Sequence, residues 1–253
     1  MNDISHSGIS IIICSRKNSI DKILMTNLTN SIGIEHEIIV IDNSNEEYSI
    51  FEAYNLGLDR SVFSIVCFLH EDIIMHTQNW GKILQNLFIS HPRAGLIGVA
   101  GGRIKCSMPS AWWDADINTV NIVQHFNHKP KEIRKYGFES TLTNEVAAID
   151  GVFMGMLKKS NIRFDERLKG FHNYDLYLSI CHHILKKKVL VTDKILIEHF
   201  SIGNIDIAWY ESTSLFHKLY KPYLPIVIGN YSDYDLRKKE IKIGFRFIMG
   251  LIE

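Results

Sequence analysis

His70, Glu71 and Asp72 directly follow the apolar run 66–69. Such a run is typical of a strand covered on both faces, as in a parallel sheet with helices packed on it. Ligands of open α/β sheets bind beyond the carboxyl ends of these strands. If the chain stays extended, His70 and Asp72 project to one side and Glu71 to the other, so that one imidazole and one carboxylate can bind a divalent cation. A solvated turn before a helix is the alternative interpretation.

Other polar groups lie at similar positions. Asp42 ends the run "IVIDNS", where its carboxylate could accept hydrogen bonds from a base or a ribose, or simply form a turn. His199 ends a later run and could share the cation of His70 and Asp72, or serve as a structural histidine. A mixed nitrogen and oxygen set suits Mn²⁺ better than Mg²⁺.

Three further side chains could bind a sugar or take part in its transfer. Asp175 lies near a predicted helix start, where it could take a proton from an attacking hydroxyl or only interact with the helix dipole. Trp112 and Trp113 have faces that match the C–H surface of a sugar ring, but adjacent tryptophans also occur as core plus lid. The pair His182 and His183 points to different helix faces and is not interpreted as a metal site.

Strands and helices alternate in the first half of the chain. Strands are predicted at 8–15, 36–44, 66–69 and 94–102, and helices between the first two strands, at 48–58 and at 79–90. Gly57 is expected to close the helix at 48–58. This order predicts a doubly wound, mainly parallel sheet flanked by helices. The turn "CSRKNSID" after the first strand has no glycine, so neither a dinucleotide fingerprint nor a P-loop is present.

The second half is less regular and implies a small antiparallel portion. Hairpins are predicted within 103–145, an apolar strand at 145–159, a helix from about Tyr174, strands at 188–193 and 195–201, and a helix at 206–220 capped by Asp206. These elements form one domain over 1–220, and 221–253 is an extension that packs on it or mediates association. The alternating tail 236–253 fits an edge strand, an amphipathic membrane-surface segment or the start of a longer chain, with a packed terminal element preferred.

Composition excludes some partners. The chain has 253 residues with 28 basic and 28 acidic side chains, so net charge gives no argument for nucleic acid. Four cysteines without a CxxC pair predict neither a disulfide nor a zinc site. No apolar run approaches the length of a membrane span, so a cytoplasmic location is expected, with the inner face of the membrane as a variant.

Seven segments in chain order resemble the family 2 glycosyltransferases with the GT-A fold, in the bacterial branch whose metal motif reads His-x-Asp. They are "SIIICSR", "EIIVIDNS", "AYNLGL", "FLHEDI", "AIDGVFM", "FDERLKGFHNYDLYLS" and "IEHFSIG". The resemblance covers about residues 8–220. It implies inverting transfer of a sugar, in one displacement, from a nucleoside diphosphate to a hydroxyl of a glycan or lipid-linked acceptor, in bacterial surface glycan synthesis.

The resemblance also assigns roles to residues. Asp72 matches the metal-binding acid, His70 replaces the usual first acid, and His199 matches a late histidine that holds the metal, Mn²⁺ or Mg²⁺, or the diphosphate. Asp175 matches the catalytic base, with tyrosines at 174 and 177 in place of the flanking acids. The donor is assigned to Ser15, Arg16, Asp42, Asn55 and Glu71, and the acceptor to Trp112, Trp113, Asp150 and Gly151.

Two classes of function remain open. The first is a metal-dependent inverting glycosyltransferase. The second is a non-catalytic nucleotide-sugar-binding or glycan-assembly subunit on the same fold, which the replaced acids would permit. Nucleotidyl transfer is disfavoured, because the first strand is not followed by a glycine-rich basic loop that would hold a triphosphate. Peripheral membrane association and a homo-oligomer are further expectations, and the tail is the segment that suggests self-association.

Overall fold

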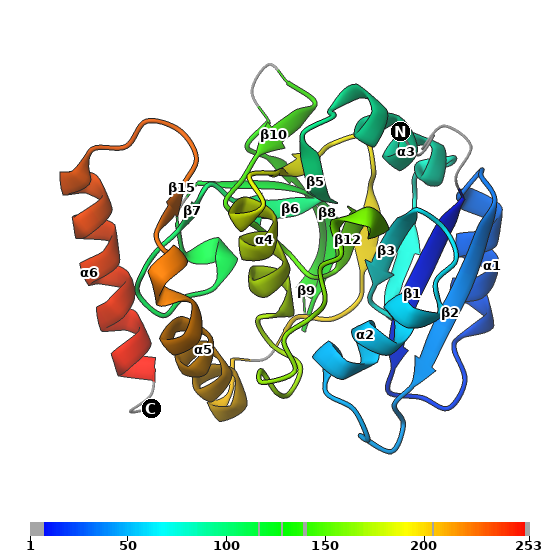
Figure 1. Ribbon diagram of the computed structural model, residues 1–253, viewed down its shortest axis with the longest axis horizontal. Helices are drawn as coiled ribbons and strands as arrows, with labels where there is room; N and C mark the ends of the chain where they lie inside the picture. Colours follow the sequence, from blue (N-terminus) through cyan, green and yellow to red (C-terminus); the bar gives the residue numbers. More distant parts are fainter. Residues whose placement is uncertain (1–7, 116, 128, 139–140, 204, 251–253) are drawn as a thin grey trace.

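The computed structural model describes residues 8–250 except 116, 128, 139–140 and 204, and its core is a central seven-stranded sheet (Figure 1). Its strands, in spatial order, are β10 (Thr143–Glu145), β13 (Lys188–Thr192), β5 (Ala94–Gly98), β12 (Phe153–Leu157), β3 (Ile65–Leu69), β1 (Ile9–Ser15) and β2 (His36–Asp42). Neighbours are parallel in the pairs β1–β2, β1–β3 and β13–β5, whereas β12 and β10 run the other way. The predicted mainly parallel sheet is confirmed.

A second, mostly antiparallel sheet of six strands adjoins the first. Its strands are β11 (Ala148–Ile149), β6 (Ala100–Gly102), β8 (Asn118–Phe126), β14 (Ile197–His199), β4 (Ile73–Met75) and β9 (Lys129–Tyr136), which pairs with β8. The pairing of β14 with β4 sets His199 opposite Ile73, immediately after the end of β3 and its polar residues. The antiparallel sheet therefore places His199 next to residues 70–72.

Two predicted strands are each divided between the sheets. The run 94–102 breaks at Val99 into β5 and β6, and the run 145–159 breaks around Asp150 and Gly151 into β11 and β12. The run 94–102 is apolar throughout because each half is buried in its own sheet, so hydrophobicity alone cannot reveal its break. In the run 145–159, Asp150 and Gly151 interrupt the apolar residues at the break.

Six helices flank the sheets among the residues that the structure describes, and several begin at clear capping residues. They are α1 (Lys22–Ser31), α2 (Ile50–Arg60), α3 (Trp80–Ser90), α4 (Tyr174–Ile184), α5 (Ile207–Tyr220) and α6 (Asp233–Gly250). Ser49 and Glu52 form a capping box at the start of α2. Asp206 caps α5 as predicted, since its Oδ1 accepts a 2.9 Å hydrogen bond from the Trp209 N–H. Short 3₁₀ turns η2 (Trp112–Ala115), η3 (Lys158–Ser160) and η4 (Lys221–Tyr223) complete the helical elements.

Gly57 does not close α2, contrary to the prediction, because the helix continues to Arg60. Gly57 instead lies where α2 crosses β1. A Cβ atom at this position would lie 2.3 Å from Cγ2 of Ile12. The glycine therefore allows close packing of helix on sheet, and its position inside the helix is a packing requirement rather than a stop signal.

The tail is helical, so the edge-strand interpretation is wrong. The two-residue strands β7 (Ile104–Lys105) and β15 (Ile226–Val227) pair with each other and lead into α6. The alternating apolar residues of the tail divide between two faces of this helix: Ile243 and Phe247 are buried, whereas Ile241 and Phe245 are exposed. No helix in the described part of the chain has both the length and the apolar character needed to cross a membrane.

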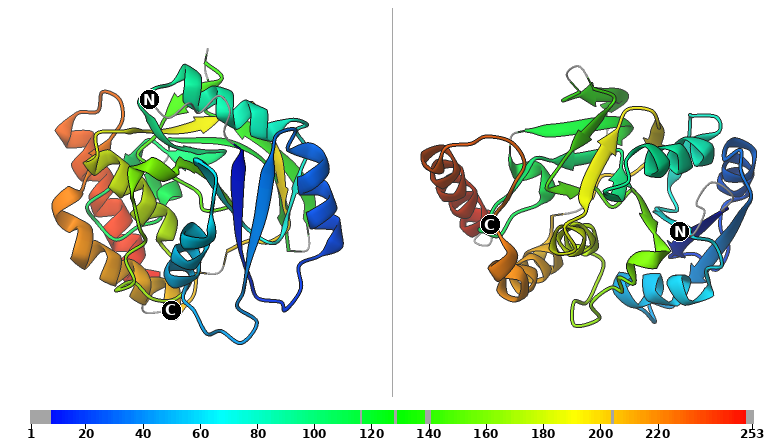
Figure 2. Two further views of the ribbon diagram at one scale, coloured as in Figure 1. Left: turned by 45° about the vertical axis from the view of Figure 1, so that its right-hand side comes forward. Right: turned by 45° about the horizontal axis from the view of Figure 1, so that its top comes forward.

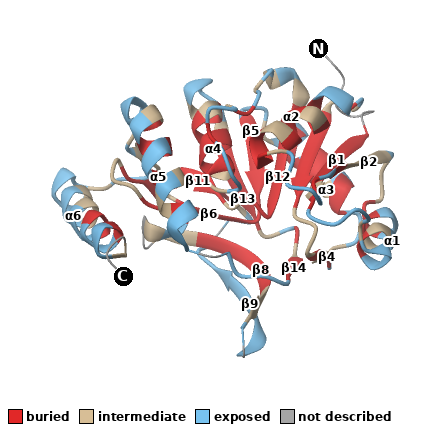
Figure 3. Cartoon of the chain, turned by 90° about the horizontal axis from the view of Figure 1, so that it is seen from below, coloured by how far each residue is buried: buried red, intermediate tan, exposed pale blue. Residues whose placement is uncertain are grey.

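The helices pack on different parts of the two sheets. Helix α2 packs on β1 and β2, and α4 packs on β5 and β13. Helices α5 and α6 lie together at the opposite end of the molecule from α1 and β2 (Figure 2). Buried residues run continuously through the central strands and β8, while β9 projects as an exposed ribbon (Figure 3). The carboxyl ends of β1, β2 and β3 thus meet β14 and the start of α4 at one edge.

Candidate active site

Three polar side chains from two distant segments converge at this edge. The Nδ1 atom of His70 lies 3.8 Å from Oδ1 of Asp72 and 3.3 Å from Nε2 of His199. Nε2 of His199 lies 3.5 Å from the same Asp72 oxygen. Ligand atoms at usual bond lengths from one cation lie roughly 3.0–3.4 Å apart. The donor set of two imidazoles and one carboxylate therefore fits a divalent cation.

Hydrogen bonds behind the cluster orient both imidazoles. Nε2 of His70 lies 2.5 Å from the Tyr174 hydroxyl, and Nδ1 of His199 lies 3.3 Å from Oε1 of Gln124. An amide oxygen can only accept, so Nδ1 of His199 carries the hydrogen and Nε2 offers its lone pair to the cluster. For His70 to bind a cation through Nδ1, its Nε2–H must likewise donate to the Tyr174 oxygen. Both contacts are of the kind that fix ligand orientation in metal sites.

The charge states of the cluster also favour a cation. Burial, together with neighbouring His199, lowers the pKa of His70, so its imidazole is neutral and can act as a ligand. Burial opposes ionisation of Asp72, but its polar neighbours, Ser201 and the imidazoles of His199 and His70, outweigh burial and hold the pKa of this carboxyl well below its usual range. The Asp72 side chain is 32% exposed, so the carboxylate remains accessible from solvent.

Glu71 points away from the cluster, as strand alternation predicts. Its carboxylate accepts a 2.6 Å hydrogen bond from the Ser15 hydroxyl and a 3.2 Å bond from the Arg16 N–H. Ser15 is the register partner of Asp42 across β1 and β2. The ends of three adjacent strands are thus joined by polar contacts, with Asp42 exposed at the outer position. The backbone N–H of Ser44 holds the pKa of Asp42 below its usual value, so this carboxylate is ionised.

Asn55 is not brought to this edge as a free side chain. It is 3% exposed, and its NH₂ group donates to the Phe164 carbonyl at 2.9 Å and to Glu166 at 2.8 Å. Its side-chain oxygen accepts the Phe164 N–H at 2.8 Å. Asn55 therefore pins the segment before α4 to α2, and the structure corrects the predicted donor contact to a packing role.

Asp175 lies in the first turn of α4, directly after the tyrosine that contacts His70. Burial and the nearby charge of Asp150 raise the pKa of Asp175 to about 7, against the opposing effect of backbone N–H groups including those of Leu176 and Gly151. Its Oδ1 accepts the Leu176 N–H at 2.7 Å. A carboxyl group with a pKa near neutrality can gain and release a proton under physiological conditions, which is what a general base requires.

The four residues assigned to the acceptor lie in two segments, Trp112 and Trp113 in η2 and Asp150 and Gly151 in the turn between β11 and β12. Oδ2 of Asp150 accepts a 3.0 Å hydrogen bond from the Trp112 indole, which is 8% exposed, and Oδ1 accepts the Val152 N–H. Trp113 stands edge-on to Trp112 and is 42% exposed, so it offers more free ring surface than Trp112. A Cβ at Gly151 would lie 2.3 Å from the Tyr174 hydroxyl oxygen, so glycine is what allows Tyr174 to reach His70.

Tyr174 is the positioning residue that sequence reasoning missed, although the chain shows it beside Asp175. We expect Tyr174→Phe to weaken Mn²⁺ binding about 10- to 100-fold, because it removes the hydroxyl that holds His70. Calorimetric titration with Mn²⁺ measures this. Tyr177→Phe is the matched control, since the Tyr177 hydroxyl donates instead to the Arg163 carbonyl. Equal affinity in Tyr174→Phe and the parent protein would contradict the assigned role.

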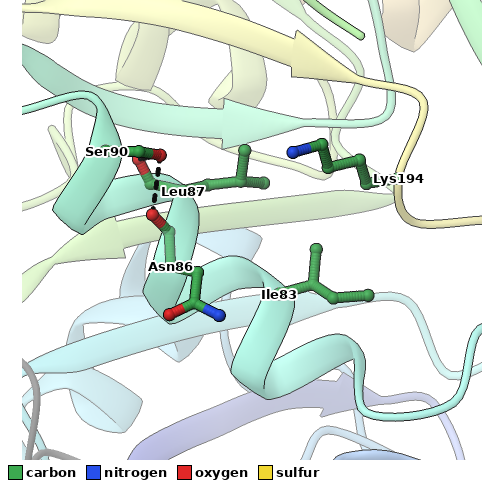
Figure 4. A pocket seen from close by; sticks show the side chains of 5 residues that line it. All are labelled: Ile83, Asn86, Leu87, Ser90 and Lys194. Atoms are coloured by element: carbon green, nitrogen blue, oxygen red, sulfur yellow. Dashed lines mark hydrogen bonds between the residues drawn. The ribbon is translucent and has the colours of Figure 1, made fainter.

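A shallow pocket elsewhere shares no residue with this site. It lies between α3 and the segment after β13, and Figure 4 shows Ile83, Asn86, Leu87 and Ser90 of the helix facing Lys194. The Ser90 hydroxyl is occupied by a 2.7 Å hydrogen bond to the Asn86 carbonyl. Because the pocket offers one lysine and mainly apolar surface, it is not a candidate for the chemistry of the site.

Comparison with known proteins gives the family and the fold. Residues 10–221 match the model of a family described as "Glycosyltransferase like family". Among solved structures, GalNAc-T7 with UDP, GalNAc and Mn²⁺ aligns over 98% of this chain with a TM-score of 0.59 and 11% identity. A197 from STIV aligns over 88% of this chain and 95% of its own, with a TM-score of 0.46 and 13% identity. A search of curated proteins finds no significant match.

The coverage and identity of each match determine whether it shows the fold or the family. This chain spans 57% of the length of the GalNAc-T7 chain, and at 11% identity that likeness shows the fold alone. The family match, in contrast, covers most of the chain and both segments that supply the His70, Asp72 and His199 cluster. The chain belongs to the glycosyltransferase-like family and has the GT-A fold expected from its sequence.

Proposed function

We propose that this protein is an inverting glycosyltransferase that moves a sugar from a nucleoside diphosphate to a hydroxyl acceptor in bacterial surface glycan synthesis. The observation that carries the proposal is the contact between His70 and Tyr174. It connects the cluster of three possible metal ligands to the start of α4, where the next residue, Asp175, has a raised pKa. Such a transfer needs two components, a set of metal ligands and a general base. Here the base is held at the start of α4.

The donor side of the site is formed by His70, Asp72 and His199 together with the strand ends. A divalent cation bound there would neutralise charge that develops on the leaving diphosphate. Asp42 is ionised and exposed at the end of β2, where it can accept hydrogen bonds from a base or ribose. Glu71 ties the chain at Ser15 and Arg16 in place, so these residues shape the donor surface through their backbone.

On the acceptor side, Asp175 removes the proton of the attacking hydroxyl. Its position at the start of α4 fixes the carboxylate, because Oδ1 of Asp175 accepts the Leu176 N–H. The exposed ring of Trp113 is the surface on which a sugar ring can stack. Attack from this side, opposite the leaving diphosphate, gives inversion at the anomeric carbon.

The first test is a screen of nucleoside-diphosphate sugars for Mn²⁺-dependent thermal stabilisation, because a ligand that binds only the native state raises the melting temperature. Donors that stabilise the protein are then incubated with acceptors, and the anomeric configuration of the product is read by NMR. Inverted product supports the proposal. Stabilisation by a donor without turnover on any acceptor would favour the non-catalytic nucleotide-sugar-binding function, and retained configuration would overturn the inverting mechanism.

The pH dependence of transfer should follow Asp175. Because its pKa is raised to about 7 and a base acts when ionised, kcat/KM should fall about tenfold per pH unit below neutrality and level off above it. Asp150→Asn removes the negative charge that contributes to this shift, so the acidic limb should move to lower pH. A pH profile of both proteins measures this, and an unchanged limb in the variant would contradict the assigned coupling.

A further inference from the structure

Helix α6 presents an apolar stripe that the described part of the chain leaves exposed. Ile241, Phe245 and Ile248 are spaced four and three residues apart, so they line one face, and they are 74%, 65% and 55% exposed. The opposite face packs inward through Ile243 and Phe247. We propose that this outer face of α6, formed by Ile241, Phe245 and Ile248 with the lysines beside them, binds the surface of an anionic lipid bilayer.

Charge on the helix matches such a surface. Lys238 precedes Ile241 by one turn on the stripe and Lys242 borders it, and neither makes an ion pair within the described part of the chain. The one acid between 236 and 250, Glu240, is turned inward and accepts a hydrogen bond from the Ser107 N–H at 2.9 Å. Apolar residues flanked by lysines on one face are characteristic of helices that lie in the interface of anionic membranes.

A second copy of the chain fits this face poorly. A two-fold dimer brings the same patch of both subunits together, so Lys238 and Lys242 of both copies would be gathered in one interface. Like charges at such short range oppose association. A bilayer of anionic lipids attracts the two lysines instead of repelling them. Its interface can also take up the apolar face of a single helix.

The start of α5 packs against α6 and carries a further exposed apolar side chain. Trp209 and Tyr210 in the first turn of α5 pack on Phe247, so the start of α5 lies beside the last turns of α6 (Figure 1). Ile207, at the beginning of α5, is 74% exposed. The start of α5 therefore adds one exposed apolar side chain beside the last turns of α6.

Flotation of the full chain with lipid vesicles tests the proposal. The protein should bind vesicles of phosphatidylcholine mixed with phosphatidylglycerol, bind phosphatidylcholine alone much more weakly, and lose binding as salt is raised. Replacing both lysines, Lys238→Gln with Lys242→Gln, should weaken binding about 25-fold at low salt, from about fivefold per basic residue. Phe245→Ser with Ile248→Ser should abolish it. All four side chains lie outside the core, so the melting temperature should stay unchanged.

The matched control carries the same kinds of change on another exposed surface. Lys129→Gln with Ile133→Ser alters β9, where Ile133 is 73% exposed, and should leave vesicle binding intact. Equal binding of the α6 variants and the parent protein would overturn the proposal. So would a parent protein that ignores vesicles but forms a dimer, by light scattering, that Phe245→Ser dissociates. Donor hydrolysis without lipid should be the same in all variants, so failure here leaves the proposed transferase activity separately testable.

Discussion

Asp175→Asn should lower the rate of sugar transfer by about 10² to 10⁴, the usual contribution of a positioned general base. The amide is nearly the same size and can still accept the Leu176 N–H, so the start of α4 should keep its structure. Binding of the donor and of Mn²⁺ should change little, because the cluster at His70 and His199 is intact. Steady-state kinetics at saturating donor, with calorimetry of donor binding, measures both quantities.

Asp21→Asn provides the control for this substitution. Asp21 caps α1 through a 2.7 Å hydrogen bond from the Ile23 N–H, and asparagine caps a helix about as well as aspartate. The control should transfer sugar at the parent rate. If Asp175→Asn did the same under saturating donor, Asp175 would not be the base, and the acceptor side of the site would have to be reassigned.

His199→Ala should weaken Mn²⁺ binding by more than about 100-fold, beyond the usual effect of losing a residue that only orients a ligand. The variant removes Nε2, which lies 3.3 Å from His70 and 3.5 Å from Asp72. Metal-dependent transfer should fall in parallel and recover partly at high Mn²⁺, because two ligands remain. Calorimetry and the Mn²⁺ dependence of kcat measure the two effects.

His76→Ala is the matched control for His199→Ala. His76 pairs with Glu198 at 2.7 Å, and Glu198 precedes His199 on β14 and so points to the other face of the strand. Mn²⁺ affinity should stay at the parent value in this variant. A loss as large as that of His199→Ala would mean that the effect comes from disturbing β14 rather than from removing a ligand.

Local patterns predicted the elements that carry the site. The apolar run before His70 forms β3, alternation past its end sends His70 and Asp72 to one side and Glu71 to the other, and Asp175 starts α4 as its position implied. Each of these features depends on a few neighbouring residues, so it can be predicted from the local sequence. The end of a later apolar run made His199 a candidate to join them, but its approach depends on the pairing of β14 with β4, which local sequence does not determine.

Features that depend on tertiary packing were not predictable in the same way. Tyr174 and Gln124 orient the two imidazoles from α4 and β8, and no local signal links them to residues so distant in the chain. Asn55 was assigned to the donor because its motif matched, yet only the fold shows that its amide holds Phe164. The tail alternated like a strand because alternate residues of α6 divide between a packed face and an exposed face.

The most direct test of the central claim is pulsed electron paramagnetic resonance of Mn²⁺ bound to the protein with a nucleoside diphosphate. If His70, Asp72 and His199 hold the ion together, the spectrum should show nitrogen couplings from two imidazoles, and His199→Ala should reduce them to one. Mn²⁺ bound without any imidazole nitrogen would contradict the account.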